Sequence, residues 1–345
     1  MTKQIHIGGV PIGGGAPVSI QSMCNTPTED VEATVAQIHR LEQAGCDIIR
    51  VAVPNKEAAR AVGAIKERIS IPLVVDIHFD YRLALEAVAA GADKVRINPG
   101  NIGGEDRVKA VAQACRAKGV PIRIGVNGGS LEKGLLEKYG GVTPEALVES
   151  AFGHIALLNK FDFDDICVSL KSSDVRTTMA AYRLMSERSG YPLHLGVTET
   201  GTRRMGAIKS AVGIGGLLGF GIGDTLRVSL SADPVEEVYA ARDILKALGI
   251  RKDGPDLISC PTCGRTKIDL IGLAEEVERR LQAVDKPITV AVMGCAVNGP
   301  GEASAADVGI AGGDGVGLLF RKGEIVKKVP QERLVDELFA LIDTL

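Results

Sequence analysis

Apolar runs rich in β-branched residues recur along the chain from Val18 to Leu230, and each is followed by a longer segment with charged positions. The eight runs are Val18–Met23, Asp47–Val53, Pro72–Ile77, Lys94–Pro99, Pro121–Asn127, Asp165–Leu170, Leu193–Thr198 and Thr225–Leu230. The segments after them repeat their apolar positions at the spacing of an amphipathic helix, and they cover Val31–Ala44, Lys56–Ile69, Tyr81–Ala90, Glu105–Lys118, Thr143–Asn159, Val175–Ser189, Arg203–Leu218 and Pro234–Leu248. Several close on a glycine, as at Gly119. The pattern predicts eight strands alternating with eight helices.

This repeat has the strand count and the length of a (β/α)8 TIM barrel, which typically spans about 250 residues. The runs are almost continuously apolar, as expected for parallel strands covered on both faces. A doubly wound open sheet is the alternative, but it more often has five or six strands and a glycine-rich first turn. We therefore predict an α/β fold whose first domain is a TIM barrel.

The polar stretch Arg251-Lys-Asp-Gly-Pro-Asp256 interrupts the repeat and marks a domain boundary. We place the barrel at residues 1–253 and a small α+β domain at 254–345. The predicted strands of this second domain are Leu257–Ser259, Ile288–Met293, Gly315–Phe320 and Glu324–Val329. Helices are expected at Lys267–Val284 and Glu332–Leu345, with a Gly/Ala-rich turn and short helix after Met293.

Three cysteines of the second domain have the spacing of metal ligands. Cys260 and Cys263 form a Cys-x2-Cys pair, Cys295 follows, and no histidine lies beyond His194. A structural zinc site would usually have a second Cys or His pair, and a redox dithiol would leave Cys295 without a role. An iron–sulfur cluster suits three thiolates, with Glu302 as a candidate non-thiolate ligand. The cluster is favoured from the residues alone, while zinc and the dithiol remain open.

Polar residues at the carboxyl ends of the barrel strands predict a second site, because TIM-barrel enzymes place their chemistry there. Strand alternation puts Arg96 with Asn98, Arg123 with Asn127, Ser169 with Lys171 and Arg227 with Ser229 on common faces. Arginines and a lysine within apolar strands are costly to bury without an anionic partner, and only Asp76 and Glu199 are acids among these strand-end positions. The number of cations indicates a diphosphate ligand. His78 is either an acid/base or a strand-end hydrogen bonder, and Glu199 is a candidate proton donor to a departing oxygen.

Composition narrows the class of protein further. The chain has 345 residues, 45% of them hydrophobic, with a formal net charge of −3 and no tryptophan. These values favour an enzyme with a sizeable core and argue against a nucleic-acid partner. The absence of an apolar signal segment or a long apolar run predicts a cytoplasmic protein without a membrane span. The remaining four of the seven cysteines are expected to be reduced thiols.

Six motifs together resemble the bacterial, two-domain form of the 4-hydroxy-3-methylbut-2-enyl diphosphate synthases of the methylerythritol phosphate route to isoprenoids. The resemblance covers essentially the whole chain. The motifs are Asp76-Ile-His-Phe-Asp-Tyr-Arg82, Arg96-Ile-Asn-Pro-Gly-Asn101, Arg123-Ile-Gly-Val-Asn-Gly-Gly-Ser130, Gly221-Ile-Gly-Asp-Thr-Leu-Arg227, Ser259-Cys-Pro-Thr-Cys263 and Gly294-Cys-Ala-Val-Asn-Gly-Pro-Gly-Glu302.

The resemblance implies a barrel followed by a domain similar to those of sulfite and nitrite reductases, which holds a 4Fe-4S cluster. Its cluster ligands correspond to Cys260, Cys263, Cys295 and Glu302, with Glu302 releasing one iron so that it can act as a Lewis acid. The implied reaction is the reductive ring opening and dehydration of 2-C-methyl-D-erythritol 2,4-cyclodiphosphate, with flavodoxin or ferredoxin as electron donor. The family form is a homodimer in which the cluster domain of one chain closes over the barrel of the other.

The resemblance also implies roles for the residues at the strand ends. The expected catalytic residues are Glu199 and Glu302. The expected substrate-binding residues are Arg50, Asp76, His78, Arg96, Asn98, Arg123, Asn127, Ser169, Lys171 and Arg204, with Arg203 as the alternative to Arg204. A competing function is a barrel aldolase or lyase that acts on a phosphorylated substrate through a Schiff base on Lys171 and carries a structural zinc module.

Overall fold

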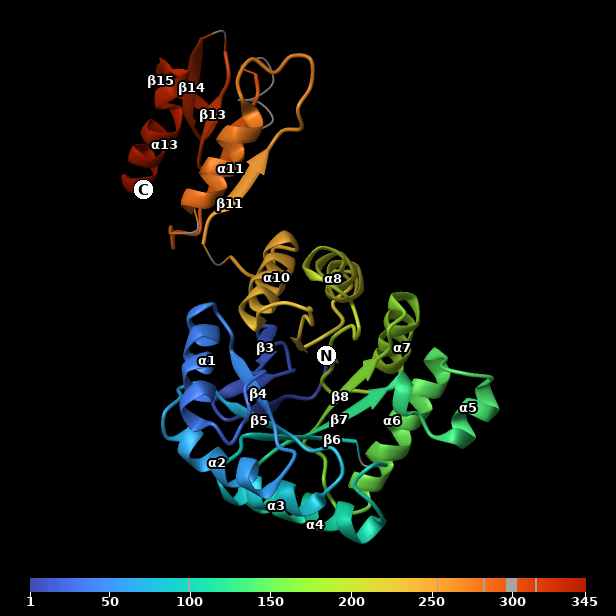
Figure 1. Ribbon diagram of the computed structural model, residues 1–345. Coiled ribbons are helices and arrows are strands. Elements are labelled where there is room, and N and C mark those ends of the chain that lie inside the picture. The colour runs from blue at the N-terminus through green and yellow to red at the C-terminus, as the bar shows by residue number, and fades with distance from the viewer. Residues whose placement is uncertain (99, 253, 282, 296–302, 314) are drawn as a thin grey trace. The chain divides into compact units, whose positions relative to one another are not determined.

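The computed structural model describes residues 1–345 except 99, 253, 282, 296–302 and 314 (Figure 1). The chain forms two compact units, Met1–Ile250 and Arg251–Leu345. In the described ranges no helix is long and apolar enough to cross a membrane. The cytoplasmic location stays a prediction from the sequence.

The first unit is a barrel of eight parallel strands, as predicted. Its sheet has the order β8-β7-β6-β5-β4-β3-β10-β9, and a parallel bridge between Val168 and Leu193 joins its two ends. The strands are β3 (Ser19–Met23), β4 (Ile48–Ala52), β5 (Leu73–Asp76), β6 (Lys94–Ile97), β7 (Ile122–Asn127), β8 (Ile166–Lys171), β9 (His194–Leu195) and β10 (Thr225–Leu226). Each strand coincides with one predicted apolar run, although β9 and β10 are only two residues long.

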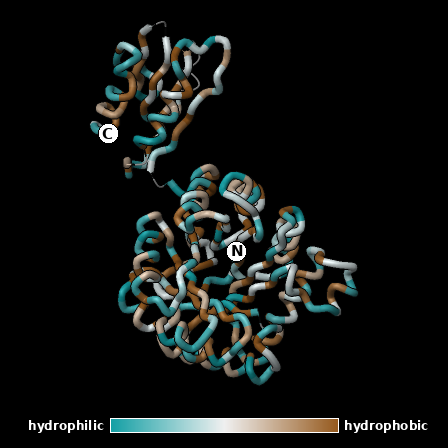
Figure 2. Tube along the Cα trace, in the orientation of Figure 1, coloured by the Kyte–Doolittle hydropathy of each residue, from teal (hydrophilic) through white to brown (hydrophobic). Residues whose placement is uncertain are grey.

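Helices surround this barrel (Figure 1). They are α1 (Val31–Gln43), α2 (Lys56–Lys66), α3 (Tyr81–Ala89), α4 (Glu105–Lys118), α5 (Lys133–Tyr139), α6 (Pro144–Asn159), α7 (Val175–Arg188), α8 (Arg203–Ser210), α9 (Gly216–Leu218) and α10 (Pro234–Ala247). Short polar side chains cap several N-termini, such as Thr143, whose Oγ1 accepts a hydrogen bond from the Ala146 amide at 3.2 Å. Apolar and polar positions alternate along these helices (Figure 2).

Three features of the first unit were not anticipated, one of them the short helix α5 between the predicted segments Glu105–Lys118 and Thr143–Asn159. The predicted helix over Arg203–Leu218 is interrupted, because Ala211–Gly215 forms a π-helical turn, η2, between α8 and α9. The opening segment forms an antiparallel hairpin of β1 (Ile5–Ile7) and β2 (Val10–Ile12). Its isoleucines pack against Ile48, Val74 and Cys167 of the barrel strands and form a core cluster of their own.

The second unit is a five-stranded mixed sheet in the order β11-β12-β13-β14-β15. Its elements are β11 (Asp256–Ser259), α11 (Leu270–Leu281), β12 (Thr289–Met293), β13 (Val308–Ala311), β14 (Val316–Arg321), β15 (Glu324–Pro330), the 3-10 turn η3 (Gln331–Arg333) and α13 (Leu334–Asp343). The side chains of Val277 and Leu338, from the two helices, pack against Val292 and Ile310 of the central strands. The sequence missed β13, and part of the expected turn and short helix lies outside the described residues.

Candidate functional site

Charged side chains from neighbouring barrel strands gather in the interior near the carboxyl ends of the strands. Strand register places Asp76 on β5 beside Arg96 on β6, and Arg96 beside Arg123 on β7. Asn127 at the end of β7 pairs in the same way with Lys171 on β8. The predicted substrate-binding residues that are buried are Arg50, Asp76, Arg96, Asn98, Arg123, Ser169 and Lys171. We call the group Arg50, Asp76, Arg96, Arg123, Lys171 and Arg227 the mouth site.

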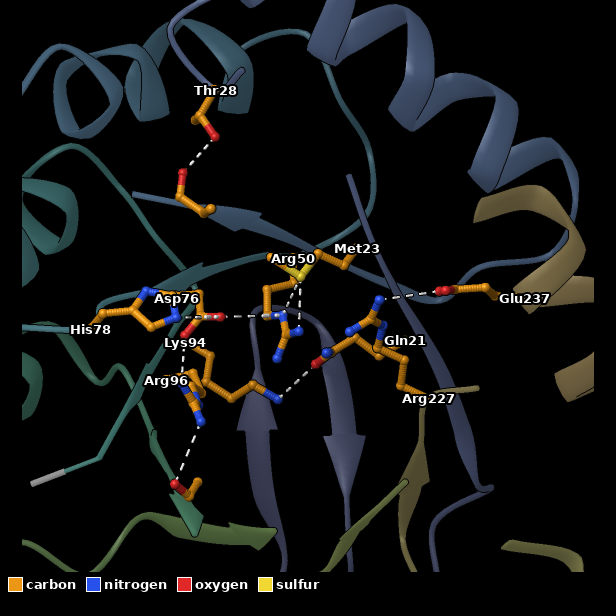
Figure 3. Close-up of polar contacts among 12 residues, drawn as sticks. Gln21, Met23, Thr28, Arg50, Asp76, His78, Lys94, Arg96, Arg227 and Glu237 are labelled. Carbon is orange, nitrogen blue, oxygen red and sulfur yellow. Dashed lines mark hydrogen bonds and ion pairs between the residues drawn. The ribbon is translucent and has the colours of Figure 1, made fainter. Parts of the chain in front are cut away.

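Asp76 is the central acid of the mouth site (Figure 3). Arg96 donates a hydrogen bond from Nη1 to Asp76 Oδ1 at 3.1 Å, and Arg50 Nε lies 3.8 Å from Oδ2. The half-exposed His78 places Nε2 3.9 Å from the same oxygen. Burial alone raises the pKa of Asp76, but the positive charges of Arg50 and Arg96 outweigh it and hold this pKa at about 2. Asp76 is therefore an ionised counter-charge and not a proton donor.

Arg123 carries a charge that no described residue balances by direct contact. Its side chain is 0% exposed, and Nε, Nη1 and Nη2 all lack a hydrogen-bond partner within the described part of the chain. Burial, followed by the repulsion of Arg96, lowers its pKa to about 10. A buried guanidinium without an acceptor is costly, so this arrangement favours binding of an anion.

Lys171 and Arg227 extend the cationic surface across the barrel. Burial, followed by the repulsion of Arg123 and Arg227, lowers the pKa of Lys171 well below its ordinary value. Arg227 Nη2 lies 3.3 Å from Glu237 Oε2 of α10, while its Nε has no partner among the described residues. From the sequence, Arg227 was one of the strand cations that indicated an anionic ligand, but it was not among the residues to which the family resemblance gave a substrate-binding role.

Two glycines make room for these long side chains. A Cβ atom at Gly125 would lie 2.4 Å from Arg96 Nε, and one at Gly196 would lie 2.7 Å from Lys171 Nζ. Carbon atoms do not approach other heavy atoms so closely, hence any side chain at these positions would displace the cation. The absence of side chains at Gly125 and Gly196 is therefore part of how the strands position Arg96 and Lys171.

The predicted hydrogen-bonding residues differ in their surroundings. The Oδ1 atom of Asn98 accepts a hydrogen bond from the Gly100 amide at 3.1 Å, which orders the turn after β6. Ser169 donates from Oγ to the Ile124 carbonyl at 3.3 Å, and Asn127 is half-buried at the end of β7. Asn98 and Ser169 thus both maintain local structure at the rim of the mouth site.

The segment after β9 carries the predicted acid and the basic pair. Glu199 is exposed and has a φ of +53°, a left-handed conformation that non-glycine residues seldom adopt. Arg203 forms an ion pair with Glu236 of α10 at 2.8 Å, whereas Arg204 is exposed beside it. The ion pair of Arg203 makes Arg204 the more available of the two arginines.

The cysteines of the second unit lie at one end of its sheet. Cys260 follows β11 and Cys295 follows β12, and these strands pair in parallel with Ser259 opposite Val292. The Gly294 amide donates a hydrogen bond to Cys260 Sγ at 3.1 Å. Hydrogen bonds from Arg265, chiefly from its backbone amide, lower the pKa of the exposed Cys263 thiol. Both effects favour thiolate, the form that binds a soft metal.

Glu302, the fourth predicted ligand, lies outside the described residues. In the described segments, no three His, Cys, Asp or Glu side chains are close enough to one another to hold a metal ion. What the structure brings together is Cys260 and Cys295 on adjacent strand ends, with Cys263 on the turn between β11 and α11.

Comparison with solved structures supports the barrel fold. The chain resembles a dihydropteroate synthase from Yersinia pestis with a TM-score of 0.53 and 15% identity, over 73% of this chain and 100% of that one. It resembles a type I 3-dehydroquinate dehydratase from Clostridium difficile with a TM-score of 0.52 and 14% identity, over 72% of this chain and 97% of that one. At such low identity, these similarities concern the fold alone.

Sequence comparison identifies the family. Residues 2–242 match the model of the GcpE TIM-barrel domain, and residues 256–344 match that of the GcpE protein C-terminal domain. A protein from Caldanaerobacter subterraneus subsp. tengcongensis is 60% identical over 99% of this chain and 97% of its own length. One from Clostridium perfringens is 59% identical over 100% of this chain and 99% of its own length, and both are named 4-hydroxy-3-methylbut-2-en-1-yl diphosphate synthase (flavodoxin). With both domain models matched and these relatives aligned end to end, the chain belongs to the GcpE family.

Proposed function

We propose that this chain is an iron–sulfur oxidoreductase that opens the ring of 2-C-methyl-D-erythritol 2,4-cyclodiphosphate and dehydrates it to 4-hydroxy-3-methylbut-2-enyl diphosphate. The proposal extends to this chain the activity named for its relatives. The structural observation that carries it is the buried mouth site, in which the three guanidinium nitrogens of Arg123 have no acceptor among the described residues. A cyclic diphosphate supplies the anionic oxygens that these donors lack.

The reaction requires two electrons and a proton when the product leaves as a trianion and water is released. One ring C–O bond breaks, and the former diester oxygen stays on the phosphate. The relatives' names support flavodoxin as the electron donor, and ferredoxin is the alternative. The chain's own contribution is to bind the diphosphate, to orient the carbon skeleton and to deliver a proton to the departing hydroxyl.

Binding of the diphosphate is assigned to the cations of the mouth site. Arg123 and Lys171 are buried and lack ion-pair partners among the described residues, so they face the phosphate oxygens directly. Arg50 and Arg96 share Asp76, which fixes their guanidinium planes before substrate arrives. Preformed positions of this kind reduce the entropy lost on binding. Arg204, the more available arginine after β9, is assigned to the outer phosphate, with Asn98, Asn127, Ser169 and His78 as hydrogen-bonding support.

Glu199 is the proposed proton donor. It lies four residues after the end of β9, and its positive φ turns the backbone out of the extended conformation at this position. Glu199→Gln preserves the shape of the side chain but removes the proton. We expect kcat to fall by at least about 100-fold while substrate affinity changes little, the signature of lost acid catalysis.

The donor set of the second unit fits a 4Fe-4S cluster. Cys260, Cys263 and Cys295 would hold three irons and Glu302 the fourth, which is consistent with N–H···S contact at Cys260 and a lowered thiol pKa at Cys263. When bound, the cluster supplies the electrons and a Lewis-acidic iron.

A homodimer is proposed from the family resemblance and from an apolar stripe on one helix. Met205, Ile208 and Val212 are 50%, 48% and 54% exposed and fall on one face of α8 and the turn after it. A second copy of the chain would cover this stripe. Ile208→Asp should shift the protein toward the monomer in sedimentation experiments, whereas Ile325→Asp, at an exposed position of β15, should not.

The proposed function is tested by metal analysis and turnover under anaerobic conditions. Wild-type protein should contain iron and acid-labile sulfide, give an EPR signal on reduction, and convert the cyclic diphosphate only when a reduced electron donor, flavodoxin or ferredoxin, is present. Cys295→Ala should lose the cluster and the activity, while Cys115→Ala, at a buried cysteine of α4, should keep both. A fully active, zinc-loaded protein without iron would refute the proposal.

The turnover assay, together with borohydride trapping, distinguishes the proposed function from the competing aldolase hypothesis. The lowered pKa of Lys171 is also what a Schiff-base lysine requires. Borohydride should trap substrate on Lys171 if the chain is an aldolase. A strict requirement for an electron donor excludes that chemistry.

A further inference from the structure

Lys94 is a buried lysine beneath the mouth site to which the proposed function gives no role. It lies on β6 two residues before Arg96, hence about 7 Å nearer the amino end of the barrel along the strand. Its side chain is 0% exposed, and Nζ donates a hydrogen bond to Gln21 Oε1 on β3 at 3.4 Å (Figure 3). No carboxylate forms an ion pair with it among the described residues.

The groups that face Lys94 come from several strands and are mostly cationic or neutral. They are Gln21 on β3, Arg50 on β4, Arg123 on β7, Cys167 on β8 and His194 on β9. Burial keeps the Cys167 thiol neutral by raising its pKa, and burial with the charge of Arg123 keeps His194 neutral by lowering its pKa. None of these groups is a carboxylate, and Asp76, the acid of the mouth site, contacts Arg50 and Arg96 instead.

Several polar atoms around Lys94 have no partner in the described part of the chain. They are Gln21 Nε2, His194 Nε2 and the three guanidinium nitrogens of Arg123. The interior below the mouth therefore contains more donors and positive charge than the described residues satisfy. Burial lowers the pKa of Lys94 to about 7, and the repulsion of Arg123 and Arg50 acts in the same direction.

We propose that Lys94 is a proton-binding positioning residue: at mildly alkaline pH it is neutral while the mouth site is empty, and it becomes charged when a diphosphate binds above it. This rests on the proposed diphosphate site. The anion's negative charge offsets the field of Arg123 and Arg50, so the ammonium form of Lys94 becomes favourable. Substrate binding is thereby coupled to uptake of a proton from solvent.

The chemistry of the reaction gives this proton a use. An open-chain diphosphate monoester has one more acidic oxygen than the cyclic diester from which it forms. Negative charge in the barrel therefore increases as the ring opens. A Lys94 already charged in the bound state would stabilise this additional charge without a change in the protein's conformation.

Calorimetric titration of the oxidised holoenzyme with the cyclic diphosphate tests the proposal. Without an electron donor the substrate binds but does not turn over, and both of its acidic oxygens are ionised at pH 8. Binding heats measured in buffers of different ionisation enthalpy then report protons taken up by the protein. At pH 8 we expect wild-type uptake to exceed that of Lys94→Met by on the order of one proton, and the difference to vanish at pH 6.

Two further variants sharpen the result. Lys109→Met, at an exposed position of α4, should take up as many protons as wild type. Lys94→Gln should behave like Lys94→Met, so one poorly folded variant does not decide the outcome. From pH 7.5 to 9, the ratio of the wild-type Kd to the Kd of Lys94→Met should rise about tenfold with each pH unit.

The outcomes separate the two proposals. Binding with equal proton uptake in wild type and Lys94→Met, or binding without uptake, overturns the role of Lys94 and leaves the proposed function intact. Failure of the wild type to bind the cyclic diphosphate overturns the proposed function and, with it, the role of Lys94.

Discussion

Replacement of Lys94 by methionine should stabilise the barrel in the absence of substrate. The unfolded chain holds this amine charged up to its ordinary pKa of 10.5, whereas burial lowers the pKa to about 7 in the fold. The folded state therefore binds fewer protons between these values, and wild-type stability increases with pH across the window. At pH 8 the penalty is about 3 kcal/mol, since each pH unit below 10.5 adds about 1.4 kcal/mol. Methionine fills a similar volume without this cost.

Urea unfolding at pH 7, 8 and 9 measures the effect on the barrel specifically. All five tyrosines lie between Tyr81 and Tyr239 and the chain has no tryptophan, so tyrosine fluorescence reports the first unit. The stability of Lys94→Met should exceed that of wild type most at pH 7, and the difference should shrink by about 1.4 kcal/mol per pH unit toward pH 9. Lys109→Met serves as the control for a change in net charge.

A stability difference that stays constant from pH 7 to pH 9 would refute the reasoning, because it would mean that Lys94 is charged in the fold throughout. A Lys94→Met barrel less stable than wild type at pH 7 would be equally incompatible with a neutral buried amine. That result would point to an anion or a water cluster that satisfies the ammonium group in the free protein.

Three further substitutions have defined outcomes. Asp76→Asn leaves two buried arginines without a counter-charge and should lower the free energy of unfolding in urea by about 3 to 5 kcal/mol at pH 7. This loss should shrink as the pH falls from 3.8 through the folded pKa of about 2, because Asp76 of the wild type is then protonated as well. A variant as stable as wild type at pH 7 would contradict this prediction. Gly125→Ala places a Cβ against Arg96. It should raise the Kd of the cyclic diphosphate, measured by calorimetry, about tenfold without unfolding the barrel. An unchanged Kd would show that Arg96 has room to move. Tyr182→Phe removes a hydroxyl that donates a hydrogen bond to the His194 carbonyl at 2.5 Å and accepts one from a backbone amide. The free energy of unfolding in urea should fall by about 2 kcal/mol. A loss below ~0.5 kcal/mol would indicate that water replaces the hydroxyl.

Local sequence was sufficient for most of the barrel because each element carries its own signal. A parallel strand covered on both faces must be apolar along its whole length, and a helix that covers it must be apolar on one face. The prediction was weaker where structure depends on distant partners. The strand β13, Val308–Ala311, is four residues long and is defined by pairing with β12 and β14. The hairpin β1–β2 is likewise stabilised by its packing against Ile48 and Val74.

In the candidate site, too, local features were predicted from the sequence and features that depend on distant partners were not. The sequence identified the cations at strand ends, because a charged residue in an apolar strand is conspicuous and strand ends meet at one edge. It also identified the cysteine spacing, which is a property of a short segment. It did not assign Arg227 or Lys94, since both could have had a carboxylate partner supplied by any other part of the chain.

The sequence by itself determined the order of elements, the two-domain plan, the residues that converge at the strand ends and the family to which the chain belongs. Only the tertiary structure decided how those charges are balanced. It gave Asp76 two arginines, gave Arg203 a partner on α10, and left Arg123 and Lys94 without a carboxylate contact among the described residues. The physical reason is that burial and pairing of a charge depend on side chains from strands far apart in the sequence.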